Sequence, residues 1–260
     1  MTKNQFIDIF ITASSKKVFI IQTLVTTLAL VGIPFFEWTP LGFFLIFLGH
    51  LLYGGVGISM TYHRYWSHRS FEFKHPLLEK ICTLLGIISG RGSPIGWVYV
   101  HREHHAYADT PRDPHDPGTK GWRIFFHNMI DYGGNVNKRW IRDLFNRRQL
   151  QINKYYMLYI LAYVVILLAI SPWLLYFFYI VPLTVSMWSL NAFVYFSHTH
   201  GKRDHDNARD NSRNNWPIAI LLFGEGWHNN HHYRASSWNM QEKWYQLDPL
   251  AWIIRLVKKA

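Results

Sequence analysis

The chain has 260 residues, and its 27 Lys and Arg against 16 Asp and Glu give a formal net charge of +11. Hydrophobic residues make up 49% of the sequence and charged residues only 17%, below the roughly 25% of an ordinary soluble domain. This composition excludes a disordered chain, and the single cysteine, Cys82, excludes a disulfide framework and a thiolate metal site.

Two long stretches of the chain are almost free of charge. Residues 18–62 contain one charged residue, Glu37, and residues 155–197 contain none. A membrane-spanning helix needs about 20 apolar residues, and each stretch is interrupted near its middle by proline. We therefore predict four spans, over residues 18–36, 41–62, 154–170 and 173–197. A soluble protein with two buried helical hairpins is the alternative, which charge-free stretches of this length disfavour.

The segments outside these stretches carry all of the lysines and arginines. Two hairpins return the chain each time to the same side of the membrane, and the positive-inside rule makes this basic side cytoplasmic. The sequence thus predicts an all-α integral membrane protein with both termini in the cytoplasm. Residues 63–153 and 198–260 are expected to form a cytoplasmic helical cap, and residues 1–260 to form a single domain.

Histidines are concentrated at the borders of the apolar stretches. Eight of the 15 form three tight clusters, namely His63 and His68; His101, His104 and His105; and His228, His231 and His232. The spacing His-x-x-His-His of the second and third clusters places three imidazoles on one face of a helix. Crowded imidazoles predict a metal site, and eight are too many for one ion. Two metal ions suit O2 chemistry, whereas a zinc hydrolase, the alternative, needs fewer ligands.

The first cluster has a different spacing. On a continuous α-helix His63 and His68 point in different directions, so we expect the helix to end or bend between them. Glu103, inside the second cluster, is expected to face away from its three histidines. Five isolated histidines are expected to be structural or surface residues, namely His50, His75, His115, His127 and His205.

These clusters have recognisable surroundings. The three boxes Gly57–His68, Trp97–His105 and Gly224–His232 are accompanied by the flanking segments Asp113–Pro117, Asp210–Trp216 and Trp244–Asp248. In these motifs the chain resembles the membrane fatty-acid desaturases, most closely the acyl-CoA Δ9 (stearoyl-CoA-type) branch in its short bacterial form. The resemblance extends from about residue 40 to residue 255.

The resemblance implies a ninth histidine ligand after the fourth span. This role falls on His198, with His200 as the alternative. The family has an asparagine four residues before this ligand, which acts from behind the ligands or through a water, but Val194 stands there in this chain. Asn191, two helical turns before His198, is expected to replace it.

The activity that the resemblance implies is an oxygen-dependent oxidation. The family introduces a cis double bond, here at Δ9, into a saturated acyl chain carried by CoA, a similar thioester or a lipid. Two iron ions and O2 take part, and no catalytic residue beyond the metal ligands is expected. Trp97 and Trp66 are expected to line or bend the tunnel that positions the acyl chain.

The resemblance also implies partners and a location. The chain has neither the length for a haem or flavin domain nor the cysteines for an iron–sulfur cluster, so a separate ferredoxin, cytochrome b5-like protein or flavoprotein must supply electrons. A bacterial plasma membrane is the expected location, and no nucleic-acid partner is expected. A membrane hydroxylase and an alkene-forming fatty-acid decarboxylase are the alternatives within this chemistry. A non-catalytic metal-binding membrane protein is the alternative from another class.

Overall fold

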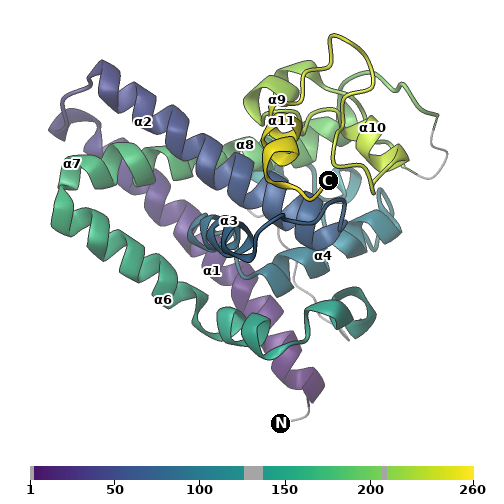
Figure 1. Cartoon of the computed structure of the whole chain (residues 1–260), viewed down its shortest axis with the longest axis horizontal. Coiled ribbons are helices and arrows are strands. Elements are labelled where there is room, and N and C mark those ends of the chain that lie inside the picture. The colour runs from purple at the N-terminus through teal and green to yellow at the C-terminus, as the bar shows by residue number, and fades with distance from the viewer. Residues whose placement is uncertain (1–2, 126–136, 207–209) are drawn as a thin grey trace.

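Two helical hairpins dominate the computed structural model, which describes residues 3–125, 137–206 and 210–260 (Figure 1). The first hairpin contains α1 (Lys3–Gly32), the 3-10 turn η1 (Ile33–Phe35), α2 (Pro40–His50) and the π-helix η2 (Leu51–Ser67), which continues α2 without a break. The second contains α6 (Arg147–Ile170), α7 (Pro172–Leu175), the π-helix η5 (Tyr176–Ile180) and α8 (Val181–Thr199). The predicted pair of helical hairpins is therefore confirmed.

Capping side chains and prolines define the turn of each hairpin. The Thr39 side chain accepts a hydrogen bond from the backbone N–H of Gly42, and Pro40 occupies the first turn of α2. Ser171 caps α7 in the same way, by accepting a hydrogen bond from the backbone N–H of Leu174. Such residues satisfy backbone groups that a helix start leaves without a partner. Both turns lie at the same end of the molecule, on the left of Figure 1.

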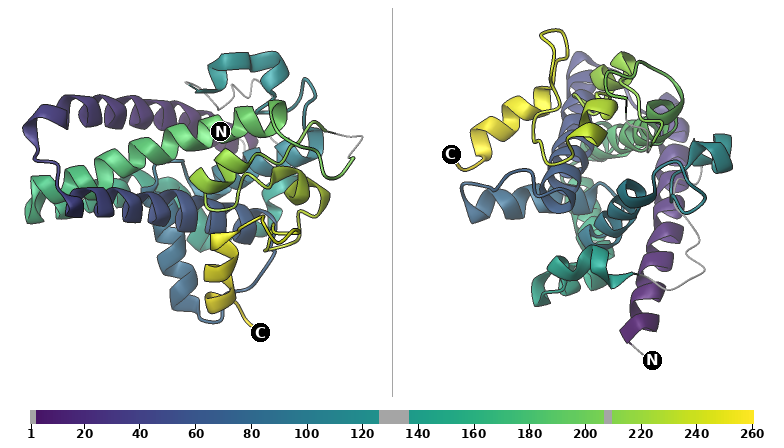
Figure 2. Two further views of the ribbon diagram at one scale, coloured as in Figure 1. Left: turned by 90° about the horizontal axis from the view of Figure 1, so that it is seen from above. Right: turned by 90° about the vertical axis from the view of Figure 1, so that its right-hand side faces the viewer.

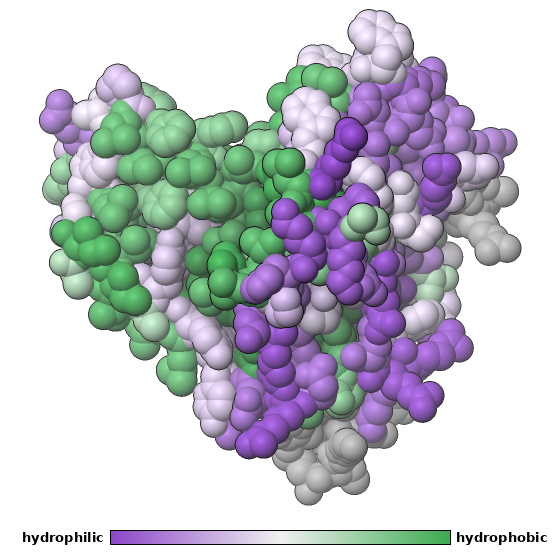
Figure 3. Space-filling model, in the orientation of Figure 1, coloured by the Kyte–Doolittle hydropathy of each residue, from purple (hydrophilic) through white to green (hydrophobic). Residues whose placement is uncertain are grey.

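Four helices of the described chain are long and apolar enough to cross a membrane, namely Lys16–Phe35, Pro40–Ser67, Arg147–Ile170 and Pro172–Thr199. They match the predicted spans except near the cap, where the second helix continues past residue 62 and the third begins before residue 154. Outward side chains such as Phe35 and Ile170 are largely exposed. Figure 3 shows hydrophobic surface over the long helices and hydrophilic surface over the opposite part of the molecule. This division matches the predicted membrane spans and the polar segments outside them.

The remaining helices form a cap at the end of the long helices opposite the two turns (Figure 2). They are α3 (Pro76–Ile88), α4 (Pro94–Tyr107), α5 (Pro117–Lys120), η3 (Gly121–Phe125), η4 (Lys138–Leu144), α9 (Trp216–Leu221), α10 (His228–Tyr233) and α11 (Pro249–Val257). Helix α3 packs tightly on η2, because a Cβ atom on Gly57 would lie only 2.7 Å from the backbone carbon of Leu85. This close approach fixes α3 beside the helix that carries the first histidines.

Buried apolar residues join the hairpins to each other and the cap to the hairpins. The main core includes Tyr53 and Leu183, which come from different hairpins. The Tyr53 hydroxyl donates a hydrogen bond to the backbone carbonyl of Phe178 over 2.9 Å, which gives this buried polar group a partner. A second cluster, with Val98 of α4 and Ile141 of η4, holds the helix of the second histidine cluster in place.

Candidate metal centre

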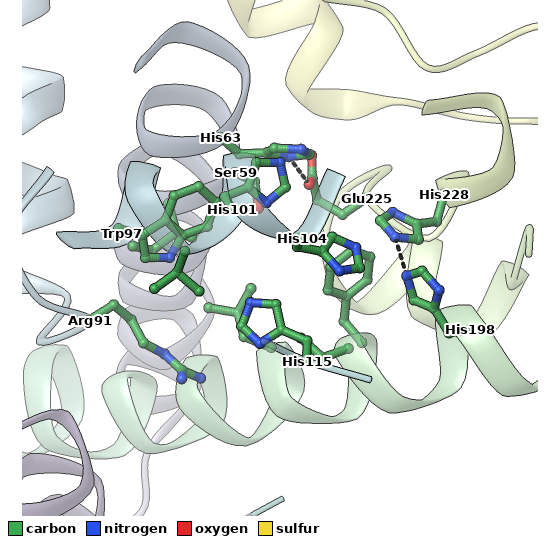
Figure 4. A pocket seen from close by; sticks show the side chains of 15 residues that line it. Ser59, His63, Arg91, Trp97, His101, His104, His115, His198, Glu225 and His228 are labelled. Carbon is green, nitrogen blue, oxygen red and sulfur yellow. Dashed lines mark hydrogen bonds and ion pairs between the residues drawn. The ribbon is translucent and has the colours of Figure 1, made fainter. Parts of the chain in front are cut away.

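Nine histidines meet where the long helices join the cap, and Figure 4 shows several of them around a common cavity. His63 lies near the end of η2, and His68 directly follows that helix. Helix α4 carries His101, His104 and His105, the end of α8 carries His198, and α10 carries His228, His231 and His232. These are the nine that the sequence analysis assigned to metal. The structure brings all of them together.

The first cluster depends on a widened helical turn. The helix was expected to end or bend between His63 and His68, and it does end there: η2 ends at Ser67, and His68 is its C-terminal cap. The backbone N–H of His68 donates to the carbonyl of His63 over 3.2 Å, five residues back. This π-type hydrogen bond places residues five apart above one another. The widened last turn and the cap residue therefore bring both imidazoles to the same site.

The second cluster lies on a regular α-helix. Ser93 caps α4 by accepting a hydrogen bond from the backbone N–H of Gly96, and Pro94 occupies its first turn. The three histidines follow at positions that share one face. The spacing argument made from the sequence therefore describes this helix correctly.

The third cluster lies on α10, a helix of only six residues that neighbouring polar groups hold in place. Its two central asparagines supply most of these anchors. The backbone N–H of Asn229 donates to the side-chain oxygen of Asn214 over 3.0 Å, and the side chain of Asn230 donates to the carbonyl of Met240 over 2.9 Å. The asparagines of this box thus position its histidines.

Among the described residues, the nine histidines divide into two groups whose ligand atoms all lie within 4.8 Å of one another. Group 1 contains His63, His68, His101, His105 and His231, and group 2 contains His104, His198, His228 and His232. The Nε2 atoms are 2.7 Å apart in the pair His68 and His101, and 3.0 Å apart in the pair His198 and His228. Metal–imidazole bonds of about 2.1 Å at right angles place neighbouring nitrogens about 3.0 Å apart. Each group therefore fits one metal ion.

Carboxylates hold the outer nitrogen of four of these imidazoles. The Nδ1 atom lies 2.5 Å from a carboxylate oxygen in the pair His63–Glu225, 2.9 Å in His104–Asp113, 3.0 Å in His198–Asp109 and 3.0 Å in His232–Asp210. A carboxylate that accepts the Nδ1–H bond fixes the tautomer and directs the Nε2 lone pair inward, as in most metal-binding histidines. The buried Nε2 atom of His232 has no hydrogen-bond partner, as a metal ligand atom requires. No pattern in the sequence assigned a role to these four carboxylates.

Burial and crowding keep most of these imidazoles neutral. Burial lowers the pKa of five histidines well below its usual value, and neighbouring imidazoles lower it further, at His68, His101, His105, His228 and His231. Burial lowers the pKa of His232 to about 4, although its hydrogen bond to Asp210 acts in the opposite direction. For His104, burial lowers the pKa, but Asp113 outweighs this effect and raises it. A neutral imidazole is the form that binds metal.

One carboxylate also connects the site to a buried ionic network. Glu225 accepts hydrogen bonds from Arg64 over 2.8 and 3.0 Å, in addition to its contact with His63. Arg64 also donates to Asp248 over 2.7 Å, and all four side chains are at most 3% exposed. This network anchors His63 to the third histidine box and to the start of α11.

An apolar cavity borders both histidine groups (Figure 4). The Trp97 ring stacks on His101 with centroids 5.0 Å apart and lines this cavity. Phe193 and Val194 of α8 complete part of the apolar lining. An apolar cavity next to a metal-binding site suits a substrate with a long hydrocarbon chain.

The structure places three other candidates away from the histidine groups. Trp66 packs in the cluster between α4 and η4 and donates to Thr83 over 3.2 Å. His200 is exposed and contacts Thr199. Asn191 was expected to face the metal, but its amide donates to Gln22 and to the carbonyl of Phe125, and its oxygen accepts from Arg91. These contacts engage both ends of the Asn191 amide.

The isolated histidines lie outside both groups where they are described. His50 is buried and contacts Ser186 and the carbonyl of Leu221, His75 caps α3, and His205 contacts Glu242 and stacks on Tyr233. His115 lines the cavity with its ring 5.5 Å from that of His104. His127 lies outside the described residues. Glu103 is buried in α4 and belongs to neither group.

Comparison with known proteins agrees with these features. The family model for fatty acid desaturases matches residues 36–257. The chain is 34% identical to the sn-2 palmitoyl-lipid 9-desaturase of Nostoc sp. (strain 36) over 239 residues, which cover 89% of this chain and 82% of that protein. It is 34% identical to the sn-1 stearoyl-lipid 9-desaturase of Anabaena variabilis over 225 residues, or 84% and 80% of the two chains. For the acyl-CoA C20 Delta5-desaturase of Anemone leveillei the identity is 32% over 232 residues, or 86% and 72%. The chain belongs to the fatty acid desaturase family.

Proposed function

We propose that the protein introduces a cis double bond at carbon 9 of a saturated fatty acyl chain, using O2 and two electrons from outside. The observation that supports this most is the apolar cavity with two histidine groups at its border. An unactivated methylene has no acidic proton, so acid–base side chains cannot remove its hydrogens. A site of mostly neutral imidazoles next to an apolar cavity is suited to oxidation instead.

The overall reaction balances as follows. One –CH2–CH2– unit, one O2, two electrons and two protons give one cis –CH=CH– unit and two waters. When bound in groups 1 and 2, two iron ions would supply the activation of O2 that this oxidation requires. The nine histidines would hold these ions, and Glu225, Asp109, Asp113 and Asp210 would fix four of the imidazoles in the metal-binding tautomer. Trp97 and its apolar neighbours would exclude water and hold one pair of acyl carbons beside the site.

We propose a membrane lipid as the carrier of the acyl chain. Two of the three relatives described above carry names of lipid desaturases, and the third is named an acyl-CoA desaturase. A CoA thioester is the second candidate, because the acyl chain would occupy the same cavity. A separate redox protein would supply the electrons. The protein would lie in the bacterial plasma membrane with the cap and both termini in the cytoplasm, which the basic charge of the non-spanning segments supports.

The decisive experiment compares the fatty acids of aerobic cells that express the chain with those of empty-vector cells. Gas chromatography–mass spectrometry would locate any new double bond. His198→Ala should abolish the product, whereas His200→Ala, two residues away and outside both groups, should retain it. The purified protein should contain about two irons per chain, and His198→Ala should contain less.

The products separate the competing functions. A new cis monoene at carbon 9 supports the proposal, and its presence first in glycerolipids or in acyl-CoA identifies the carrier. A hydroxy acid or a terminal alkene would assign the protein to a hydroxylase or a decarboxylase. Bound iron without any product, when a reductant is supplied to the purified protein with acyl lipid and acyl-CoA, would favour a non-catalytic metal-binding protein.

A further inference from the structure

A cluster of arginines forms a shallow, open surface on the cap, which we name the arginine patch. Among the described residues, it consists of Arg69, Arg102, Arg139 and Arg142, arranged around Asp143. Arg69, Arg139 and Arg142 are exposed, and the Arg69 side chain is 64% exposed. Four guanidinium groups against one carboxylate leave this surface strongly positive.

Hydrogen bonds fix the centre of the arginine patch. Arg102 donates to both oxygens of Asp143 over 2.7 and 3.0 Å, and Arg69 donates to the same carboxylate over 3.1 Å. The Arg139 guanidinium lies over the Trp140 ring, 4.7 Å from its centroid. The patch is therefore a preformed surface in which the outer arginines remain available to a partner.

The backbone that carries the arginine patch also carries ligands of group 1. Arg69 follows His68, and Arg102 follows His101, and the Nε2 atoms of these two histidines are 2.7 Å apart. The Arg102 guanidinium also donates to the carbonyl of Ser67, the residue before His68, over 2.8 Å. A short hydrogen-bonded and covalent path thus links the patch to one side of group 1.

The exposure of the group 1 histidines also indicates access to the site from the side of the arginine patch. His68 is one of the two members of group 1 that are partly exposed, whereas His63, His101 and His231 are buried. The apolar cavity is lined by residues of α8 and by Trp97, and none of its lining residues belongs to the arginine patch. An acyl chain in the cavity and a partner on the arginine patch therefore do not compete for the same side chains.

We propose that the arginine patch is the docking surface for an acidic protein that carries single electrons, and that these electrons enter at the side of group 1 formed by His68 and His101. This inference rests on the proposed function, which needs two electrons for each double bond. At each docking the carrier loses one electron and the metal centre gains it, so two dockings complete one turnover. Opposite charge is what accelerates such transient encounters between proteins.

The test measures reduction of the iron-loaded protein in lipid nanodiscs, in an anaerobic stopped-flow instrument. The probes are a reduced plant-type ferredoxin, the soluble domain of an acidic cytochrome b5 and a reduced flavodoxin. Arg142→Glu reverses one exposed charge of the patch, and Arg255→Glu makes the same change in net charge on α11. Dithionite, which needs no docking surface, reports whether the metal centre of each variant is intact.

At least one carrier should reduce the unmodified protein at a rate that falls as salt is added. Arg142→Glu should slow this reaction about tenfold, by the usual effect of a reversed rim charge on association, and Arg142→Lys should restore most of it. Arg255→Glu should change it little, and dithionite should reduce all variants alike. The inference is overturned if no acidic carrier reduces the protein that dithionite reduces, or if Arg142→Glu slows no carrier. A raised KM for acyl-CoA in Arg142→Glu, with unchanged reduction rates, would instead assign the patch to phosphate binding.

The outcomes also separate this inference from the proposed function. If Arg142→Glu slows a salt-dependent reduction but no double bond is formed, the docking surface is supported and the desaturase function is rejected. If a double bond is formed with dithionite, and the carriers reduce the protein at rates that do not depend on the arginine patch, the desaturase function is supported and the docking surface is rejected.

Discussion

Glu225 offers the sharpest test of the metal centre, because one carboxylate serves both His63 and Arg64. In Glu225→Gln the amide keeps the size of the carboxylate but carries both a donor and an acceptor. If its oxygen accepts from His63, its NH2 group faces the donors of Arg64, and the reverse orientation leaves His63 without an acceptor. The side chains are at most 3% exposed, so water cannot compensate.

Two magnitudes follow from this geometry. Loss of a carboxylate behind a ligand histidine lowers metal affinity about 10- to 100-fold, which corresponds to about 1.4 to 2.8 kcal/mol. The unsatisfied buried donor costs about 1–3 kcal/mol of folding stability in addition. Group 1 should therefore lose its metal at a chelator concentration at least tenfold lower, and the thermal midpoint of the metal-free protein should fall.

The assay is a chelator titration in detergent, followed by iron analysis and by thermal unfolding. Glu242→Gln is the matched control, because Glu242 also contacts a histidine, His205, but with a side chain that is 29% exposed. Such an exposed pair contributes at most about 1 kcal/mol. Retention of iron by Glu225→Gln at the wild-type chelator concentration would refute the assignment of Glu225 to the metal centre.

Three further predictions test other parts of the structure. Because burial lowers the folded-state pKa of most group 1 histidines below their unfolded value near 6.5, the unfolded chain binds more protons below that pH. The metal-free protein should thus lose thermal stability between pH 7.5 and pH 5. The raised pKa of His104 offsets only part of this loss of stability. An unfolding midpoint that stays constant over this pH range would contradict the prediction. Gly57→Ala forces a Cβ against backbone atoms of α3 and should cost about 1–3 kcal/mol, whereas Gly55→Ala meets only side chains and should cost less in the same unfolding measurement. Trp97→Ala should change the position of the double bond or the preferred chain length, measured by mass spectrometry, whereas Trp66→Ala should lower stability without moving the double bond.

The four long apolar helices and the grouping of the histidines could be predicted because each depends on local sequence. Stretches without charge define the spans wherever they occur, and the i, i+3, i+4 spacing places three histidines on one face of any α-helix. The widened turn before His68 could not be predicted in this way, because the tight packing of η2 against α3 is a tertiary property. The sequence therefore identified the two histidines of the first cluster but not the backbone that aligns them.

The carboxylates and Asn191 show the limit of reasoning from spacing. Asp109 lies 89 residues from His198 in the sequence, and Glu225 lies 162 residues from His63, so no local pattern pairs them. Asn191 has a suitable position on α8 when residues are counted along the helix. Its amide nevertheless binds Gln22, Phe125 and Arg91, which come from three other segments. Which polar groups meet across a core is decided by the fold as a whole.

The distribution of these carboxylates makes the two histidine groups chemically different. Group 2 has three carboxylates behind four imidazoles, whereas group 1 has Glu225 alone behind five, and Arg64 offsets the charge of Glu225. Negative surroundings favour the more highly charged, oxidised state of a bound metal, and positive surroundings favour the reduced state. The arginine patch adds further positive charge beside group 1. With an iron ion in each group, as we propose, the protein's own charges would make the ion in group 1 the easier of the two to reduce, which is the property that a point of electron entry requires.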